Sequence, residues 1–182
     1  MRSARATNLV VQKMQSEQVI HQMTPVEDWK CHAKAMSMYF VEPEELSTQP
    51  RYNTALSTHD RVAELAESLA AEVIVARYFG LPYSIDDSCF KRAADVGAGL
   101  EVRWTRYDSG QLIVYPHDRD DDIAILVTGR SGKGFVIAGW MPVKVARRSR
   151  YKHGTQESWW VPQDRLAPIE TLGSSVYANR IS

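Results

Sequence analysis

The chain has 182 residues, and its 22 Lys and Arg residues balance its 22 Asp and Glu residues, so the formal net charge is zero. This length fits one domain with an extension, or two small domains at most. The balanced charge does not indicate a nucleic-acid partner, so any basic surface must be local.

The two cysteines, Cys31 and Cys89, belong to no CxxC or Cys/His ligand pattern, which argues against a structural zinc site and against a disulfide framework. Their use fits a reducing cytosol. The start of the chain has no apolar run of signal-peptide length, and no segment approaches the ~20 apolar residues that span a bilayer. We expect a soluble, cytoplasmic protein.

The first 57 residues are expected to form a helical or irregular extension. Thr24 can cap a helix, Pro25 suits its first turn, and Glu27 completes a capping box, which together predict a helix to about residue 38. Residues 41–57 carry the Pro, Asn and Ser/Thr content of a linker. The extension is a candidate contact surface for a protein partner.

The main domain is expected over residues 58–182. Its strongest element is a helix from Thr58 to Phe79, which Gly80 ends. Apolar residues recur along this helix at intervals of three and four, at Val62, Leu65, Ala66, Leu69, Val73 and Ala76. Such a stripe predicts that one face of the helix is buried.

The middle of the chain changes to the period of strands. Residues 100–105 and 111–116 flank an Asp-Ser-Gly turn and predict a β-hairpin. The HDRDDD segment (117–122) is expected to be a solvated loop, and the apolar run at 123–129 a buried strand. A fourth strand is expected at 135–140, a short helix or a basic loop at 142–149, another short strand at 158–162 and a closing helical turn at 163–172. The order predicts an α+β fold with a central mixed sheet of four to five strands flanked by helices.

The candidate chemistry lies on and before the strand at 100–105. Glu101 and Arg103 share one face of this strand because side chains alternate. Asp95 precedes them across a segment in which Gly97 and Gly99 allow a tight turn back toward Glu101. Two carboxylates so placed form a hard-oxygen site suited to Mg²⁺ or Mn²⁺. The alternative is a turn residue followed by an ion pair on a solvated sheet face.

One acid of the helix at 58–79 is selected by its position. At about 100° per residue, Glu72 lies beside the apolar stripe, whereas Glu64 and Glu67 point away from it. A carboxylate at the edge of a buried face needs a partner. Glu72 is therefore the helical acid predicted to belong to the site, with an ordinary helix-surface acid as the alternative.

The arrangement resembles the PD-(D/E)XK, or restriction-endonuclease-like, superfamily, which places an acid on a helix, Asp on a first strand and (Glu/Asp)-x-Lys on the next. The matching text is AAEVIVARYFGL, DVGAGLEVRWT and LIVYP, within residues 58–141. The GLEVRWT segment is most similar to the MutH-like branch, and similar text occurs in phage-encoded proteins of this kind.

The resemblance implies that Asp95, Glu101 and the carbonyl of Val102 bind a metal ion, with Glu72 holding a water or a second metal. The metal would activate water for in-line attack on a DNA phosphodiester. Arg103 stands where the family has Lys. Arginine keeps its charge and cannot act as a base, although it can clamp a phosphate oxygen. Arginine at the position of the family's lysine implies one of two things. Either the enzyme works without this lysine, or the chain is a weakened or inactive relative that only binds nucleic acid.

One dense basic cluster, made of Arg147, Arg148, Arg150 and Lys152, is a candidate to follow a phosphate backbone. A solvated basic loop is the alternative. Three functions remain open: a Mg²⁺-dependent, phage-encoded deoxyribonuclease; a non-catalytic protein on the same core that binds nucleic acid or protein; and an oligomeric assembly protein, such as a homodimer, that uses residues 1–57.

Overall fold

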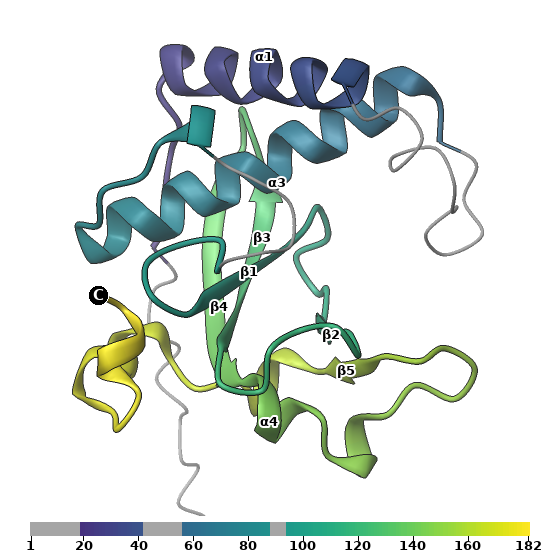
Figure 1. Ribbon diagram of the computed structural model, residues 1–182, viewed down its shortest axis with the longest axis vertical. Coiled ribbons are helices and arrows are strands. Elements are labelled where there is room, and N and C mark those ends of the chain that lie inside the picture. Colours follow the sequence, from purple (N-terminus) through teal and green to yellow (C-terminus); the bar gives the residue numbers. More distant parts are fainter. Residues whose placement is uncertain (1–18, 42–55, 88–93) are drawn as a thin grey trace, which may run out of the picture.

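The computed structural model describes residues 19–41, 56–87 and 94–182. They form an α+β fold built in layers (Figure 1). Helix α1 (Pro25–Val41) lies on helix α3 (Thr58–Phe79), which covers one face of a three-stranded sheet; a two-stranded sheet lies on the opposite side. Residues 1–18 of the expected extension, most of the linker and Cys89 fall outside the described residues.

Both long helices begin and end where the sequence predicts, with one extension. The backbone N–H of Thr24 donates to Glu27 Oε2 at 2.8 Å, and the N–H of Glu27 donates to Thr24 Oγ1 at 3.3 Å, so the capping box of α1 is confirmed. This helix runs to Val41, beyond the predicted end. In α3, the Ser57 side chain caps the first turn and Gly80 ends the helix at φ 65°, a left-handed conformation that favours glycine.

The three-stranded sheet has the order β1-β3-β4. Strand β1 (Leu100–Thr105) runs parallel to β3 (Ile123–Arg130), and β4 (Gly134–Pro142) runs antiparallel to β3. The first six residues of β3 are all buried, which confirms the strand predicted from the apolar run. This strand is central and covered on both faces, so it has no polar alternation.

The predicted β-hairpin is wrong. Strand β2 (Leu112–Val114) does not pair with β1; it pairs antiparallel with β5 (Trp159–Val161) in a separate two-stranded sheet. The turn between the two strands exists, with the Gly110 N–H donating to the Tyr107 carbonyl at 2.9 Å. After it, however, the apolar side chains of β2 pack against the face of the first sheet. In place of the predicted single sheet of four to five strands, the structure has a mixed sheet of three strands and a separate sheet of two strands.

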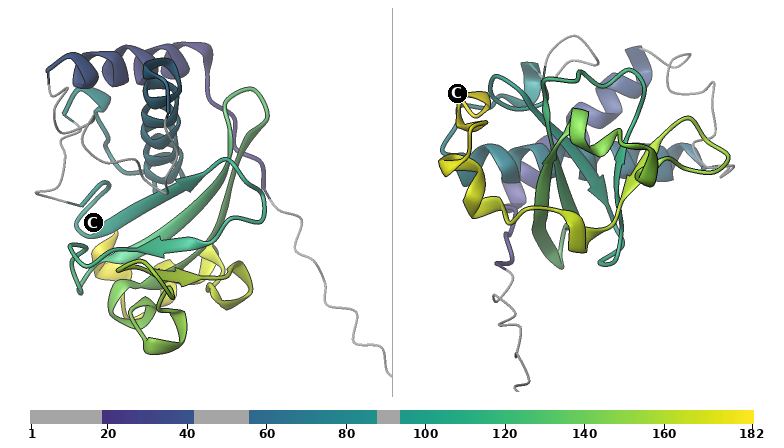
Figure 2. Two further views of the ribbon diagram at one scale, coloured as in Figure 1. Left: turned by 90° about the vertical axis from the view of Figure 1, so that its right-hand side faces the viewer. Right: turned by 90° about the horizontal axis from the view of Figure 1, so that it is seen from below.

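Other elements cover both faces of the three-stranded sheet (Figure 2), and a hydrophobic core lies on each face. On the helical face, α3 packs against the even-numbered residues of β1 and the odd-numbered residues of β3, including Leu100, Val102, Ile123, Ile125 and Val127. On the other face, Ala124 and Leu126 pack with β2, β5 and α4 (Val143–Ala146). Helix α1 contributes Cys31, a buried free thiol, to the helical side.

Short 3-10 turns complete the chain: η2 (Ile85–Asp87), η3 (Ser149–Tyr151), η4 (Gln163–Arg165), η5 (Ile169–Ser174) and η6 (Ala178–Arg180). The helical turn expected within 163–172 is thus confirmed, and of the two alternatives for 142–149 the short helix is present as α4. The last turn returns to the segment before β1, where the Gly99 N–H donates to the Arg180 carbonyl at 3.0 Å. In the ranges that the structure describes, no helix combines the length and the apolar character that crossing a membrane requires.

Candidate active site

Asp95 is placed by a tight turn directly before β1. An isolated bridge joins Val96 to Leu100, and Gly97 takes a φ of 59° between them. The turn brings Asp95 back beside the strand, where its Oδ2 accepts a hydrogen bond from the Val102 N–H at 2.7 Å. The glycine-rich segment therefore does what the sequence suggested: it returns Asp95 toward the edge of β1.

Glu101 and Arg103 share one face of β1, as predicted, and they form an ion pair. In the parallel register, Glu101 lies opposite Ala124 and Arg103 opposite Leu126. Because Ala124 and Leu126 belong to the core on the β2–β5 side, the two charged residues also point to that side. The ion pair of the alternative interpretation is present, but the sheet face is not solvated, since only 17% of the Glu101 side chain and 20% of the Arg103 side chain are exposed.

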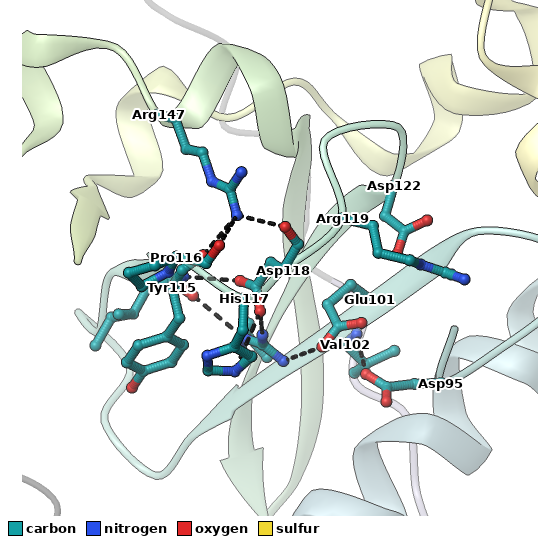
Figure 3. Close-up of polar contacts among 12 residues, drawn as sticks. Asp95, Glu101, Val102, Tyr115, Pro116, His117, Asp118, Arg119, Asp122 and Arg147 are labelled. Carbon is teal, nitrogen blue, oxygen red and sulfur yellow. Dashed lines mark hydrogen bonds and ion pairs between the residues drawn. The ribbon is translucent and has the colours of Figure 1, made fainter. Parts of the chain in front are cut away.

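Arg103 is held by three acceptors at once (Figure 3). Besides Glu101, its guanidinium donates from Nη2 to Asp118 Oδ1 at 2.6 Å and from Nε to the Ile113 carbonyl at 3.2 Å. The guanidinium also lies 5.6 Å from the ring centre of Tyr115. Three of its five N–H groups are thereby used, which leaves two for another acceptor.

Asp118 comes from the HDRDDD segment, which was expected to be a solvated loop. That expectation is wrong for Asp118 and Asp122, whose exposed fractions are 7% and 3%. Asp118 accepts from Arg103 and from the Tyr115 N–H at 2.8 Å, and Asp122 accepts from Arg119 Nε at 2.7 Å. Each buried carboxylate has a cationic partner, which is why burial is tolerated.

Arg147 fixes this loop from the end of α4. Its Nη2 donates to the carbonyls of Tyr115, Pro116 and Asp118, and its Nη1 donates to the Asp120 carboxylate (Figure 3). The side chain is only 19% exposed. Arg147 therefore holds the loop that presents Asp118 to Arg103, and its guanidinium is already committed to protein acceptors.

Glu72 reaches the site from the other side of β1. It lies on α3, which packs on the face of β1 opposite Glu101. Its Oε2 accepts a hydrogen bond from the Tyr83 hydroxyl at 2.6 Å. The two acids that the helix geometry set aside lie elsewhere: Glu64 pairs with Arg106 and Glu67 accepts from the Ser131 N–H.

The pKa values show that the three acids repel one another. Burial raises the pKa of Glu72 to about 8, with a further rise from Asp95 and a smaller one from Glu101, against the hydrogen bond from Tyr83. Burial and the Glu101 charge raise the pKa of Asp95 to about 7. Burial also raises the pKa of Glu101, which Arg103 opposes. Glu72 and Glu101 thus approach the β1 edge from opposite faces, with Asp95 between them.

Arg103 is the cation of this group. Burial alone would lower its pKa, but Glu101 and Asp118 raise it above the ordinary arginine value. One guanidinium therefore faces the carboxylates of Glu101 and Asp118 directly and those of Asp95 and Glu72 at longer range. When all four acids are ionised, the group carries an excess of negative charge, which an additional cation would stabilise.

The donor set fits a hard divalent cation only in part. Glu72, Asp95 and Glu101 each accept a hydrogen bond from a protein donor at one carboxylate oxygen, which leaves the second oxygen of each as a ligand atom. The Val102 carbonyl points to the same free edge as the Val102 N–H, because both groups of a strand residue lie on one side. However, in the described ranges no three His, Cys, Asp or Glu side chains are grouped so that they could hold one ion.

Three of the four predicted basic residues form an exposed patch on the side of the second sheet. Arg148, Arg150 and Lys152 are exposed, and the Arg150 guanidinium lies 4.8 Å from the Tyr151 ring centre. Arg147 differs from them because its donors are taken by the 115–120 loop. We refer to Arg148, Arg150 and Lys152 as the basic patch.

Sequence reasoning missed Asp118, Tyr83 and His117 as members of the site. Asp118 stood in a run of acids that looked solvated, and Tyr83 followed a helix end. The one available signal was Pro116, two residues after β2, because proline favours a turn, and the chain does turn there with the Asp118 N–H donating to the Tyr115 carbonyl at 3.2 Å. Pairing of β2 with β5 was not foreseen, so this signal could not be used.

Comparison with known proteins adds nothing to these observations: no family model, curated protein or solved structure matches the chain. The function has to be argued from the site itself.

Proposed function

We propose that the chain is a metal-dependent nuclease that hydrolyses DNA phosphodiesters on a restriction-endonuclease-like core, as in the phage-encoded proteins that the sequence resembles. The observation that carries the proposal is the placement of Asp95 at the edge of β1, held by the Val102 N–H at 2.7 Å, within electrostatic range of Glu101 and of Glu72. Buried acids that raise one another's pKa are costly to the fold, and such costs concentrate at functional sites.

The residues take distinct roles in this proposal. Asp95 and Glu101, with the Val102 carbonyl, would hold a Mg²⁺ or Mn²⁺ ion, and Glu72 would orient a water molecule. Two carboxylates and a carbonyl are hard-oxygen ligands of the kind that Mg²⁺ takes together with several waters. Once bound, the ion would supply Lewis-acid polarisation of the scissile phosphate.

Arg103 would bind the substrate phosphate rather than transfer a proton. Two of its N–H groups are unused by protein acceptors, and a guanidinium is suited to charge-assisted hydrogen bonds with phosphate oxygens. Glu101 and Asp118 fix its orientation beforehand, which lowers the entropic cost of substrate binding. The basic patch would contact the DNA backbone beyond the site.

The test is cleavage of a plasmid and of labelled oligonucleotides in Mg²⁺ or Mn²⁺, with the Glu101→Gln and Asp95→Asn variants. Each variant keeps the side-chain shape and removes a charge that would hold the metal, so we expect at least about 10²-fold slower cleavage. Glu64→Gln is the matched control, because Glu64 lies on α3 but pairs with exposed Arg106; its rate should equal that of the wild type.

Metal binding should also be visible without cleavage. A ligand that binds only the folded protein stabilises it by about 2.7 kcal/mol at 100 times its Kd, so Mn²⁺ should raise the melting temperature of the wild type and of Glu64→Gln, but not that of Glu101→Gln. Absence of cleavage and of any metal-dependent stabilisation in the wild type would rule out the proposed nuclease.

A second candidate, a protein on the same core that binds nucleic acid without cleaving it, is favoured by one specific observation. Arg103 already supplies a cation to Glu101 and Asp118, so part of the charge that a metal would neutralise is balanced internally. This candidate predicts DNA binding that is unchanged by EDTA and by Glu101→Gln, together with no cleavage.

A partner surface on the extension is supported by the outward face of α1. Val26, Trp29 and Met36 are 63%, 70% and 49% exposed, at helical spacing on the side away from α3. Large apolar residues in such a stripe are typical of interfaces, and a homodimer or a protein partner would bury them. Because Cys31 and Ala35 of α1 lie in the core, the sharp test is Trp29→Ser with the solution mass measured by light scattering. A monomeric wild type would count against a homodimer.

A further inference from the structure

The proposed hydrolysis needs a proton acceptor, and Arg103 cannot be one. A guanidinium stays charged at any pH that proteins tolerate, and Arg103 is further stabilised in its charged form by Glu101 and Asp118. The water that attacks phosphorus must nevertheless lose a proton. In the proposed function Asp95 and Glu101 hold the metal, and Glu72 accepts a hydrogen bond from Tyr83, so the proton acceptor is sought among the neighbouring side chains. Accepting a proton near neutral pH is the ordinary task of histidine.

His117 lies on the loop between β2 and β3, next to the buried carboxylate of Asp118. Its Nε2 is 3.7 Å from Asp118 Oδ1, the same oxygen that Arg103 Nη2 contacts at 2.6 Å. The residues therefore form a continuous series from Glu101 through Arg103 and Asp118 to His117 (Figure 3). Asp118 is buried, whereas the His117 side chain is 64% exposed, so the series of ion pairs ends at the solvent.

The orientation of His117 is fixed although the residue is exposed. Its ring stacks on Tyr115, with ring centres 5.5 Å apart and an angle of 8° between the planes. The backbone beneath it is held by Arg147, which binds the carbonyls of Tyr115, Pro116 and Asp118. A general base has to be positioned within reach of the water before it can be effective, and both contacts reduce the freedom of this imidazole.

We infer that His117 is the general base of the proposed reaction, a role that rests on the proposed nuclease function. The water oxygen forms a bond to phosphorus, and one water proton passes to an imidazole nitrogen of His117. The bond from phosphorus to one deoxyribose oxygen breaks, and that oxygen takes a proton from solvent. His117 then returns its proton to solvent. Asp118 stabilises the imidazolium in the interval, as a carboxylate does beside a catalytic histidine.

The charged groups around His117 are Asp118 on its own loop, Arg103 and Glu101 from β1, and Arg147 from the end of α4. Arg103 and Arg147 remain charged throughout, and Asp118 is already held by Arg103 and by the Tyr115 N–H. The contribution of His117 is therefore read from the difference between the kcat profiles of the wild type and of a variant without this imidazole.

The experiment compares the pH dependence of cleavage by the wild type, His117→Gln and His32→Gln. His32 on α1 is a matched control, because its Nδ1 also lies 3.7 Å from an aspartate oxygen, that of Asp28. We expect His117→Gln to lower kcat about 10²-fold or more with little change in KM, and to flatten the rise of kcat between about pH 5 and pH 8. His32→Gln should behave as the wild type. Imidazole added to His117→Ala should restore part of the lost rate.

The possible results separate this inference from the proposed function. If the wild type cleaves and His117→Gln keeps its kcat and pH profile, the inference is wrong and the nuclease stands. A higher KM at unchanged kcat would overturn it as well, because His117 would then act in binding. If the wild type does not cleave, both fail. Unchanged affinity of His117→Gln for an oligonucleotide in EDTA, together with the loss in kcat, would support it.

Discussion

At the scale of single residues, Arg103 connects the folding of the site to its chemistry. It lies between Glu101 and Asp118, two carboxylates with little exposure. Removing one partner of a buried ion pair leaves the other uncompensated, at a cost of about 3–5 kcal/mol. Arg103→Gln should therefore lower the free energy of unfolding by about 3 kcal/mol. In Arg103→Gln/Asp118→Asn part of this loss should be recovered, because the uncompensated charge is gone.

Urea unfolding of the two single variants and the double variant measures this coupling directly. The double variant should lose on the order of 1–3 kcal/mol less than the sum of the single losses. Arg165→Gln is the control, since Arg165 and Asp164 form an exposed pair with atoms 3.6 Å apart, and its effect should stay within about 0.5 kcal/mol. Additive losses would show that Arg103 and Asp118 act independently.

Glu72 gives a pH prediction with a definite sign. Its pKa is about 8 in the folded protein, against an ordinary value of 4.5, so ionisation is unfavourable to the folded state. The protonated side chain of Glu72 favours the folded state. Its contribution to the free energy of unfolding is fully present below about pH 4.5 and is lost as the pH rises through about 8. In EDTA, Glu72→Gln should be more stable than the wild type at pH 8.5, on the order of 1–3 kcal/mol, and about equal to it at pH 5.

The measurement is chemical unfolding of both proteins at the two pH values. Glutamine keeps an acceptor for the Tyr83 hydroxyl, so the comparison isolates the charge of Glu72. Glu64→Gln removes a charge from the same helix at an exposed position and should not gain stability at high pH. An equal difference between Glu72→Gln and the wild type at both pH values would contradict the raised pKa.

At the scale of elements, local signals predicted α3, β1 and β3, but not which strands pair. Caps and a 3.6-residue period are local properties, and Ser57, Gly80 and the buried stripe fixed α3 on their own. Pairing depends on contacts distant in sequence. β1 lies beside β3 in parallel, an arrangement that a turn at Gly110 does not indicate. The uninterrupted apolar content of β3 was the available signal, because strands buried on both faces are typical of parallel sheets.

The site was predictable to the same extent. Asp95 and Glu101 followed from a glycine turn and strand alternation, and Glu72 from its angle on the helix, all of which are local geometry. Asp118 joins the site through Arg103, and the loop that carries it is fixed by Arg147 from a later part of the chain. Nothing local distinguishes Asp118 from the acids that follow it. The partners of a buried charge are decided by tertiary packing, so they could not be inferred from spacing.

The turn that places Asp95 depends on Gly97. Its φ is 59°, and a Cβ added there would lie 2.2 Å from the Ile181 carbonyl oxygen. Gly97→Ala should combine a left-handed backbone penalty of about 1–2 kcal/mol with displacement of the C-terminal residues, for a total of about 2–4 kcal/mol. Gly132→Ala isolates the first contribution, because φ is 82° there and nothing lies within 4 Å of the added Cβ. Thermal and urea unfolding should rank the two variants in this order.

At the scale of the whole molecule, the site lies at the free edge of β1, where the helical layer and the β2–β5 layer meet. Glu72 comes from the first layer and Asp118 from the loop that leaves the second. The basic patch lies on the second layer, and the outward apolar stripe of α1 lies on the first. The two surfaces are therefore on opposite sides of the molecule (Figure 1), so a protein partner on α1 leaves the DNA-facing side open.

The small number of exposed cations in the basic patch predicts a weak dependence of DNA binding on salt concentration. The net charge of the chain is zero, and the basic patch supplies three exposed cations, since Arg147 is committed to the 115–120 loop. If each of the three neutralises one phosphate, counterion release contributes about −0.9 per contact to the slope of log Kobs against log[salt], or about −2.7 from the basic patch, in addition to the single contact proposed for Arg103. A cleft with many phosphate contacts would give a far steeper slope.

Fluorescence anisotropy of a labelled duplex, titrated at several salt concentrations in EDTA, measures the slope. Arg150→Gln and Lys152→Gln should each reduce its magnitude by about 0.9 without changing the melting temperature, because both side chains are exposed. Arg147→Gln should differ in kind: loss of its hydrogen bonds to the loop should lower the stability by about 2 kcal/mol or more. An Arg147→Gln protein as stable as the wild type but with a reduced slope would return Arg147 to the DNA-binding surface and require a further contact.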